Sequence, residues 1–324
     1  MKYRDFAPAL KYGAKIMPED LAGMIGLPYV GKVFYVDPSA GSDTANSGTS
    51  QDDAFATVTA AYAACTSGKH DVVIIAPTGG TGRTTEVAAI TWAKRFTHLI
   101  GSCAPVSTSP RAGLDFSSAV VSPCFTVSEN GCIFKNLTFA TSADINSMVV
   151  VSGSRNYFEN CHIQGSTNDT AGNDAAWRAL TVDGGDENLF VGCTIGVDTF
   201  ARSTTNASLE LTGVCERNAF KDCFFPTYGD NAGPLFVKVA NNDAAQRWLL
   251  FQDCIFTNPV VGGSTAMTIG VSLFSNLLNG VVILRNSYFY GVTNMCDNAS
   301  NVMVANHVLA TAADSAIMSV YANT

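Results

Sequence analysis

The sequence predicts an all-β fold, a right-handed parallel β-helix solenoid with an N-terminal capping helix and an extended N-terminal arm. A six-residue phrase occurs six times between residues 134 and 289. It reads as a large apolar residue, any residue, a turn-former, a small residue, any residue and a second large apolar residue. The phrases begin at Phe134, Phe158, Phe190, Phe220, Phe251 and Leu284, which lie 24, 32, 30, 31 and 33 positions apart. Such a period is typical of stacked repeats.

The spacing inside the phrase identifies each repeat as a coil of short strands. Phe158 and Cys161 are three positions apart, whereas Cys161 and Ile163 are two apart, so the period-two alternation of a strand breaks between them. The break holds residues that tolerate a left-handed backbone: Asn136, Asn160, Gly192, Asp222, Asp253 and Asn286. A second apolar ladder accompanies the phrase: 149–151, 180–182, 209–211, 237–239, 267–269 and 302–304. Each coil is therefore predicted to contain about three strands separated by bends.

The chain is predicted to form one elongated domain with extensions at both ends. Its 324 residues are 47% hydrophobic and 14% charged, which is enough apolar material for a continuous inner core. No run of about 18 apolar residues occurs, so no transmembrane segment is predicted. The predicted regions are an N-terminal docking arm (1–32), a first strand and capping helix (33–77), the parallel β-helix (78–310) and a C-terminal tail (311–324).

The region before the repeats carries a family resemblance. It contains an apolar strand at 33–36, a loop with Asn46 and Gly48, an amphipathic stretch at 54–65 and a second strand at 71–77. With the repeats, these segments resemble right-handed parallel β-helix proteins of the pectate-lyase-like class, especially those of bacteriophage virions. The resemblance implies that residues 54–65 form a helix that caps the open end of the core. It covers about residues 33–306 and implies a fold more than a function, because this scaffold carries lyases, hydrolases and inert structural proteins.

Residues 1–32 lie outside the repeats and are predicted to form an arm that docks on a partner. The segment has a formal charge of +2, which leaves −10 for the rest of a chain whose net charge is −8. A segment this short is not stable alone and needs a surface, which is either a partner or the β-helix of its own chain. The predicted docking residues are Tyr3, Arg4, Phe6, Lys11, Tyr12, Met24, Ile25 and Leu27.

The cysteines indicate a reduced thiol stack rather than disulfides. The phrase places Cys161, Cys193, Cys223 and Cys254 at one inward position on successive coils. In-register parallel neighbours are about 4.8 Å apart, which exceeds the β-carbon separation that a disulfide prefers. The N-terminus lacks the apolar region of a secretory signal, so we expect synthesis in the cytosol, where thiols stay reduced. The dispersed cysteines and histidines predict no metal site and no other cofactor.

Carboxylates at the turn position of the phrase are candidates for catalysis. A polysaccharide lyase or hydrolase on this scaffold needs two or three carboxylates on adjacent coils, and a lyase also needs a base. Asp222 and Asp253 form such a pair by register, but they fill the turn position, so we assign them a backbone role. Glu210 and Lys238 stand on adjacent coils and are interpreted as an exposed cross-strand ion pair.

The other acidic residues lie in bends and loops. Asp183, Asp186 and Glu187 occupy a bend between the two ladders and are interpreted as a turn. The best catalytic alternative is a groove formed by three further carboxylates: Asp169, Asp174 and Asp198. The sequence therefore predicts that the protein is not an enzyme, with a polysaccharide lyase or glycoside hydrolase as the alternative.

Five loops are expected to leave the coil at one corner and project from one flank of the stack. They comprise residues 164–178, 196–207, 226–234, 257–266 and 290–300. This flank suits lateral protein contacts or glycan binding, and a solvated surface is the alternative. The aromatic residues that could make such contacts are Trp177, Phe200, Tyr228 and Tyr290.

Three classes of function are compatible with these features. We favour a non-enzymatic structural protein of a bacteriophage virion, specifically a capsid decoration protein attached through its arm. This class explains the docking arm, the reduced thiols and the sparse catalytic residues. The alternative is a tailspike or tail-fibre protein that binds or depolymerises polysaccharide, which would be expected to have a C-terminal trimerisation region and an acid-lined groove. A free bacterial carbohydrate-active enzyme would be expected to carry an export signal.

The favoured class defines the expected partners and location. We expect the major capsid protein or another virion protein as partner, further copies of the chain in a homo-oligomer such as a trimer, and host glycans on the loop flank. Neither nucleic acid nor a membrane is expected. The predicted location is the virion, after synthesis in the host cytoplasm.

Overall fold

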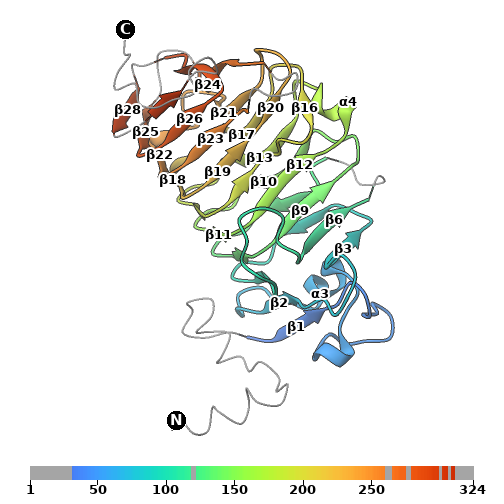
Figure 1. Ribbon diagram of the computed structural model, residues 1–324. Coiled ribbons are helices and arrows are strands. Elements are labelled where there is room, and N and C mark those ends of the chain that lie inside the picture. The colour runs from blue at the N-terminus through green and yellow to red at the C-terminus, as the bar shows by residue number, and fades with distance from the viewer. Residues whose placement is uncertain are drawn as a thin grey trace, which may run out of the picture.

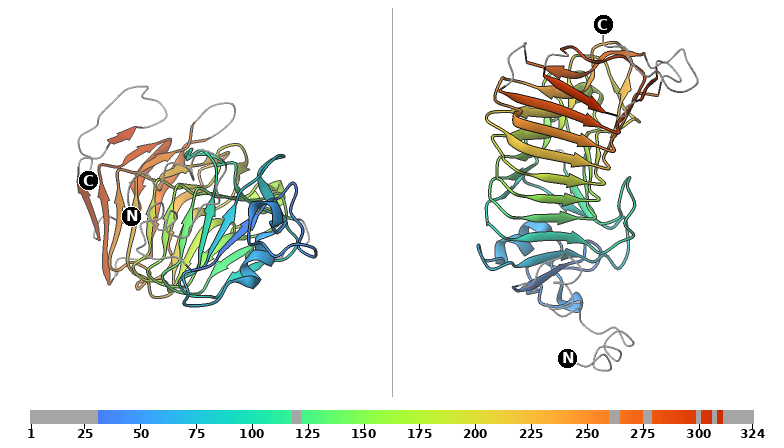
Figure 2. Two further views of the ribbon diagram at one scale, coloured as in Figure 1. Left: turned by 90° about the horizontal axis from the view of Figure 1, so that it is seen from below. Right: turned by 90° about the vertical axis from the view of Figure 1, so that its left-hand side faces the viewer.

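Short parallel strands form three long sheets that wind around one axis, as Figure 1 shows. The computed structural model describes residues 31–117, 122–259, 265–274, 279–298, 301–305 and 308–310. Every paired strand in these ranges runs parallel to its neighbour, and successive coils stack along the axis (Figure 2). The predicted right-handed parallel β-helix is confirmed. The arm residues 1–30, with all eight predicted docking residues, and the tail 311–324 lie outside the described ranges.

Each coil from β2 to β27 contributes one strand to each sheet, and the coils at the two ends contribute fewer. Sheet A contains β1 (Val33–Val36), β2 (Val72–Ile75), β5 (His98–Gly101), β8 (Ile133–Lys135), β11 (Tyr157–Glu159), β14 (Leu189–Val191), β18 (Glu216–Lys221), β22 (Gln246–Gln252), β25 (Gly280–Arg285) and β28 (Val302–Ala305). Sheet B contains β3 (Arg83–Glu86), β6 (Gly113–Phe116), β9 (Thr138–Thr141), β12 (His162–Ser166), β15 (Thr194–Ile195), β19 (Phe224–Pro226), β23 (Ile255–Thr257), β26 (Tyr288–Tyr290) and β29 (Val308–Ala310). Sheet C contains β4 (Ile90–Trp92), β7 (Phe125–Val127), β10 (Ser147–Val151), β13 (Arg178–Asp183), β17 (Ala207–Thr212), β21 (Leu235–Val239), β24 (Met267–Leu273) and β27 (Val292–Cys296).

The repeated phrase stacks in register, as predicted. Its leading phenylalanines pair across sheet A, and the rings of Phe134, Phe158 and Phe190 stack with centroids 4.6 and 4.7 Å apart. Such contacts recur at every coil, so each coil buries its apolar face against its neighbours. The turn residues have a left-handed backbone, with φ between 49° and 60°. Asp222 and Asp253 are among them, which confirms their backbone role.

The four phrase cysteines form a buried column of free thiols, as predicted. Cys161, Cys193 and Cys254 have no exposed surface and Cys223 has 1%. Each thiol donates to a main-chain carbonyl of the preceding coil; Cys193 Sγ, for example, lies 3.6 Å from the oxygen of Phe158. A weak donor of this size therefore fits the position without leaving a polar atom unpaired.

Two segments of the predicted second ladder are placed differently. In β24 it is Val271, and not a residue of 267–269, that pairs with Val237, because period-two alternation alone does not fix the register of a long strand. Residues 302–304 belong to sheet A, where Val304 pairs with Leu284. The reason is that the chain enters β27 directly after Gly291, so residues 292–296 are a strand of sheet C and not the predicted loop.

The short helix α3 (Val58–Ala64) packs on the first coils through its buried residues Val58 and Ala61. It begins later than residue 54 because Phe55 pairs with β1 and the Thr57 hydroxyl accepts from the amide of Ala60 as an N-cap. The other helices, α4 (Asp169–Gly172) and the 3-10 turn η2 (Gln51–Asp53), are also short. Within the described ranges, no helix has the length and apolar character needed to cross a bilayer.

Candidate functional site

The structure separates the carboxylates that the sequence proposed as a catalytic groove. Asp169 and Asp174 line a shallow depression beside α4, together with Thr204. Asp198 is not among the residues lining that depression; its charge acts on His162 of sheet B, where it only partly opposes the lowering of the pKa by burial. The Asp174 carboxylate accepts from the amide of Ala176 at 2.8 Å, which is the role of a turn residue.

The remaining candidates have structural roles. Glu210 pairs with Lys238 at 3.0 Å, as predicted, but the pair is not exposed, because the Glu210 side chain is 17% exposed and also pairs with the buried Arg178 at 2.6 Å. These two cations hold the pKa of the Glu210 carboxyl below its usual range despite burial. Gly184 and Glu187 have positive φ angles, which confirms the turn at 183–187.

The four aromatic residues assigned to the loop flank differ in exposure. Trp177 is 1% exposed, which corrects its assignment as a contact residue. Its indole N–H donates to Ser166 O at 3.1 Å, and the Arg202 guanidinium lies 4.7 Å from the ring centroid, so the ring packs beneath the loops. Phe200 and Tyr228 are half-buried, and Tyr290 is 37% exposed on sheet B. The loops 164–178, 196–207 and 226–234 do lie together, between sheets B and C, and β16 (Ala201–Arg202) of one pairs with β20 (Tyr228–Gly229) of the next.

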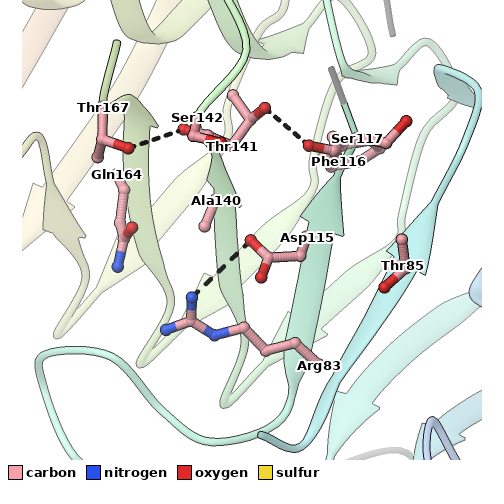
Figure 3. A pocket seen from close by; sticks show the side chains of 10 residues that line it. All are labelled: Arg83, Thr85, Asp115, Phe116, Ser117, Ala140, Thr141, Ser142, Gln164 and Thr167. Atoms are coloured by element: carbon pink, nitrogen blue, oxygen red, sulfur yellow. Dashed lines mark hydrogen bonds and ion pairs between the residues drawn. The ribbon is translucent and has the colours of Figure 1, made fainter. Parts of the chain in front are cut away.

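A polar cleft lies on the outer face of sheet B, over its first four strands. Its volume is about 380 Å³, and Figure 3 shows the arrangement of its side chains. Arg83 and Asp115 lie on one side, Gln164 lies on the other, and the small Ala140 lies between them. The cleft is lined by Arg83, Thr85, Asp115, Phe116, Ser117, Ala140, Thr141, Ser142, Gln164 and Thr167.

Strand register brings these residues together from four coils. Arg83 pairs with Gly113 and Thr85 with Asp115, so Arg83, Thr85 and Asp115 point to the same face of the sheet. Gln164 follows the inward Ile163 and therefore points to that face as well, and the register with β9 shifts between Ile163 and Gly165, so that Gly165 pairs with Ala140. Gly165 makes the bulge possible, because its φ is +79° and a Cβ there would lie 2.4 Å from the Trp177 ring.

The cleft offers both charged and neutral hydrogen-bonding groups. Arg83 Nη1 lies 3.9 Å from the Asp115 carboxylate, and no hydrogen bond to the guanidinium occurs among the described residues. Burial raises the pKa of Asp115, although Arg83 opposes this shift. The Ser117 hydroxyl is buried and also finds no partner within the described part of the chain. Planar donors of an arginine suit carboxylate groups, and hydroxyls suit the hydroxyls of a ligand.

A strap, defined here as residues 102–112, crosses this face beside the cleft (Figure 1). It binds the outward side chains of three successive strands. Thr138 Oγ1 donates to Pro110 O at 2.8 Å and Thr194 Oγ1 donates to Ser107 O at 2.6 Å. Between them, the Ser109 amide donates to His162 Nδ1 at 3.0 Å. The strap therefore covers the outward row next to the cleft, where it contacts His162, which is 2% exposed.

Lowering the pH is expected to destabilise the protein between pH 6.5 and about 4. Burial lowers the pKa of His162 from 6.5 to about 4 and that of His98 to about 3. The unfolded chain therefore binds more protons than the folded chain in this interval, and the free energy of unfolding falls as the pH falls. Urea denaturation at pH 7, 5.5 and 4.5 measures the slope. The His162→Asn variant should show a shallower slope, and an equal slope would contradict the assignment.

The cleft is not among the sites predicted from the sequence. A signal was present at Asp115, which stands between the apolar residues Leu114 and Phe116 in a strand. Nothing in the sequence relates Arg83 or Gln164 to it, since the six phrases begin only at residue 134. Among the described residues, no group of three or more His, Cys, Asp or Glu side chains is placed to hold a metal ion.

Solved structures with the same architecture include enzymes and a viral protein. Pectin methylesterase PemA from Erwinia chrysanthemi superposes with a TM-score of 0.52 at 16% identity, covering 87% of this chain and 90% of its own. The fold is that of pectate-lyase-like parallel β-helix proteins. Pectate lyase Pel9A gives a TM-score of 0.52 at 14% identity, with 86% of this chain and 80% of that chain covered. ORF18 of Geobacillus virus E2 gives a TM-score of 0.54 at 14% identity and covers 90% of this chain, which spans 54% of the viral chain.

No protein-family model matches the sequence, and no curated protein matches it either. The structural likenesses lie between 14% and 16% identity and show the fold alone. One of these neighbours is a viral protein. The likeness does not show that this chain comes from a bacteriophage.

These neighbours contradict the prediction that the protein is not an enzyme. That prediction took the scarcity of carboxylates at turns and loops as evidence for a purely structural role. Pectin methylesterase and pectate lyase, however, are enzymes that share the fold over most of this chain. The polar cleft lies on the outward rows of sheet B and not at the turn positions. The likeness does not assign an activity.

Proposed function

We propose that this protein is a bacteriophage virion protein that binds an acidic polysaccharide in the cleft of sheet B, in the manner of a tailspike or tail-fibre protein. The observation that carries the proposal is the guanidinium of Arg83, which makes only a 3.9 Å ion pair with Asp115 among the described residues and faces a cleft otherwise lined by hydroxyls and an amide. An arginine in such a site supplies planar donors to a sugar carboxylate, and the hydroxyls bind the ring substituents.

Two of the structural neighbours support this reading. A pectin methylesterase has been solved with a hexasaccharide on the same scaffold, with a TM-score of 0.52 at 15% identity. The viral ORF18 protein supports a phage setting. The proposed partners are accordingly a host polysaccharide, other virion proteins and further copies of the chain, and the proposed location is the virion.

The capsid decoration role predicted from the sequence rests on the arm. Residues 1–30 of that arm, which include all the predicted docking residues, lie outside the described ranges. The cleft favours the tailspike or tail-fibre role instead, because recognition of a surface polysaccharide is the task of that class. Attachment to the particle through residues 1–32 stays part of the proposal.

The Arg83→Gln variant is expected to bind acidic polysaccharides at least about tenfold more weakly than the wild type, since charge-assisted hydrogen bonds to a carboxylate are lost. Isothermal titration with polygalacturonate, alginate and hyaluronate measures the affinity, and dextran and amylose serve as neutral polymers that should not bind. Assays for new reducing ends and for unsaturated products, run on the same mixtures, show whether a bound chain is also cleaved.

Arg155→Gln is the matched control, because Arg155 is an exposed arginine that pairs with Glu187 away from the cleft. This variant should bind like the wild type. The proposal fails if none of the acidic polymers binds, or if Arg83→Gln binds them as tightly as the wild type does.

A further inference from the structure

Gln164 stands opposite Arg83 across the cleft, and its amide orientation follows from a chain of hydrogen bonds behind it (Figure 3). The chain begins at the strap. The backbone N–H of Ser109 can only donate, and it points at His162 Nδ1 from 3.0 Å, so Nδ1 must be the unprotonated acceptor. His162 Nε2 lies 3.1 Å from Gly196 O, which can only accept, so Nε2 must carry the proton.

The tautomer of His162 then determines the orientation of the Gln164 side-chain amide. The amide nitrogen of Gln164 lies 3.4 Å from His162 Nδ1 and 3.2 Å from Ser109 Oγ. A flipped amide would place its oxygen against the Nδ1 lone pair, which is repulsive, so the nitrogen must face the strap. The amide oxygen Oε1 is therefore left as a hydrogen-bond acceptor for the cleft.

The surroundings of His162 hold its ring in place, so that it can orient the Gln164 amide. It is 2% exposed, and the strap, Thr138 and Thr194 enclose it along the outward row of sheet B. The charged groups that act on it are Arg83 and Asp198, with opposite effects on its pKa, and burial keeps it neutral down to about pH 4. The orientation of the Gln164 amide is therefore maintained at neutral pH.

We propose that Gln164 is a specificity-determining residue of the cleft, where its Oε1 accepts a hydrogen bond from a sugar hydroxyl while Arg83 holds the carboxylate, and that His162 and the strap are the positioning groups that keep Oε1 turned outward. This inference rests on the proposed function and names its substrate class more narrowly. The sugar unit must present a carboxylate and a free hydroxyl at once. A site that presents a fixed acceptor rejects a unit whose hydroxyl is blocked, because the acceptor is left unpaired.

The test compares polygalacturonate with O-acetylated polygalacturonate, in which the carboxylates are free and the hydroxyls are blocked. Wild-type protein is expected to bind the unmodified polymer at least about tenfold more tightly. The Gln164→Met variant, of similar length and without the acceptor, should bind both polymers equally. His162→Phe should lose the discrimination in the same way, while Arg83→Gln should weaken binding of both polymers and keep their ratio. Thermal unfolding of each variant checks that the fold is intact.

A readout without polysaccharide separates the two proposals. Nitrogen-15 NMR of the imidazole should show the Nε2–H tautomer of His162 above pH 5 and its loss near pH 4. The Nδ1–H tautomer would overturn the inference, as would discrimination that survives in Gln164→Met. If no acidic polymer binds the wild type although the tautomer is as expected, the proposed function fails together with the role of Gln164 in it, and the hydrogen-bond chain stands as a structural lock only.

Discussion

Replacing Cys193 with aspartate is expected to lower the free energy of unfolding by about 4 kcal/mol or more, because a carboxylate would be buried beside two main-chain carbonyl oxygens. The thiol has no exposed surface and lies 3.5 Å from the oxygen of Val191 and 3.6 Å from that of Phe158. Both neighbours are acceptors, so an ionised aspartate would face like partial charges. Urea denaturation followed by circular dichroism measures the loss.

Cys193→Ser is the matched control. The same position in the sixth phrase is occupied by Ser287, whose hydroxyl lies 3.1 Å from Arg285 O and is fully buried. A serine is therefore compatible with this site, and we expect a loss of about 1 kcal/mol. An aspartate variant as stable as the serine variant would show that the column of thiols is not sealed from solvent.

Replacing Glu86 with alanine is expected to cost about 3 kcal/mol and to detach α3 from the first coil. The Glu86 side chain is 1% exposed and accepts from the amides of Val58 and Thr59, at 2.8 and 3.3 Å, at the start of the helix. The hydroxyls of Thr59 and Thr84 also donate to it, at 2.6 and 2.7 Å. Truncation would leave these four donors without their acceptor in a buried place, and a negative charge favourable to the helix N-terminus would be lost.

The opposite end of α3 is held by the complementary charge. Lys94 Nζ donates to three main-chain oxygens at the helix C-terminus, among them Tyr62 O at 2.7 Å. Hydrogen exchange should therefore show lost protection across residues 58–64 in Glu86→Ala, and Glu86→Gln should lie between it and the wild type. Glu159→Ala, which removes a half-exposed partner of Lys135, is the control and should change stability by less than about 1 kcal/mol. Unchanged exchange in Glu86→Ala would show that α3 is anchored by its apolar face alone.

The repeating part of the molecule could be predicted because its contacts are periodic. Phe158 meets Phe134 and Phe190 through the same stacking that continues to Phe220 and Phe251, so one phrase predicts the inward column, the turn and the free thiols. The prediction of the second ladder was wrong towards the C-terminus, where the spacing of the repeats becomes less regular. In β24 the residue that pairs with Val237 is Val271, four positions after the predicted partner. Residues 302–304 belong to sheet A and not to the predicted ladder, because residues 292–296 form a strand where a loop was predicted.

The candidate site lies where no period operates. Arg83, Asp115 and Gln164 come from three coils of unequal length, and the register of β12 shifts beside Gln164. By contrast, the buried asparagines that stand two positions before a phrase follow the period: the Asn188 side chain accepts from the amide of Asn156 and the Asn218 side chain accepts from that of Asn188, both at 2.9 Å.

By itself, the sequence determined the stacked coil, its inward column and its turns, because these depend on side-chain types recurring at one spacing and on contacts between neighbouring coils. Only the tertiary structure decided which outward residues share a face, where the strap crosses and how His162 orients Gln164. Those outcomes depend on the path of an irregular segment, residues 102–112, whose contact between Ser107 and Thr194 joins residues 87 positions apart. The sequence of residues 102–112 contains no repeat, so nothing in it predicts which distant residues this segment contacts.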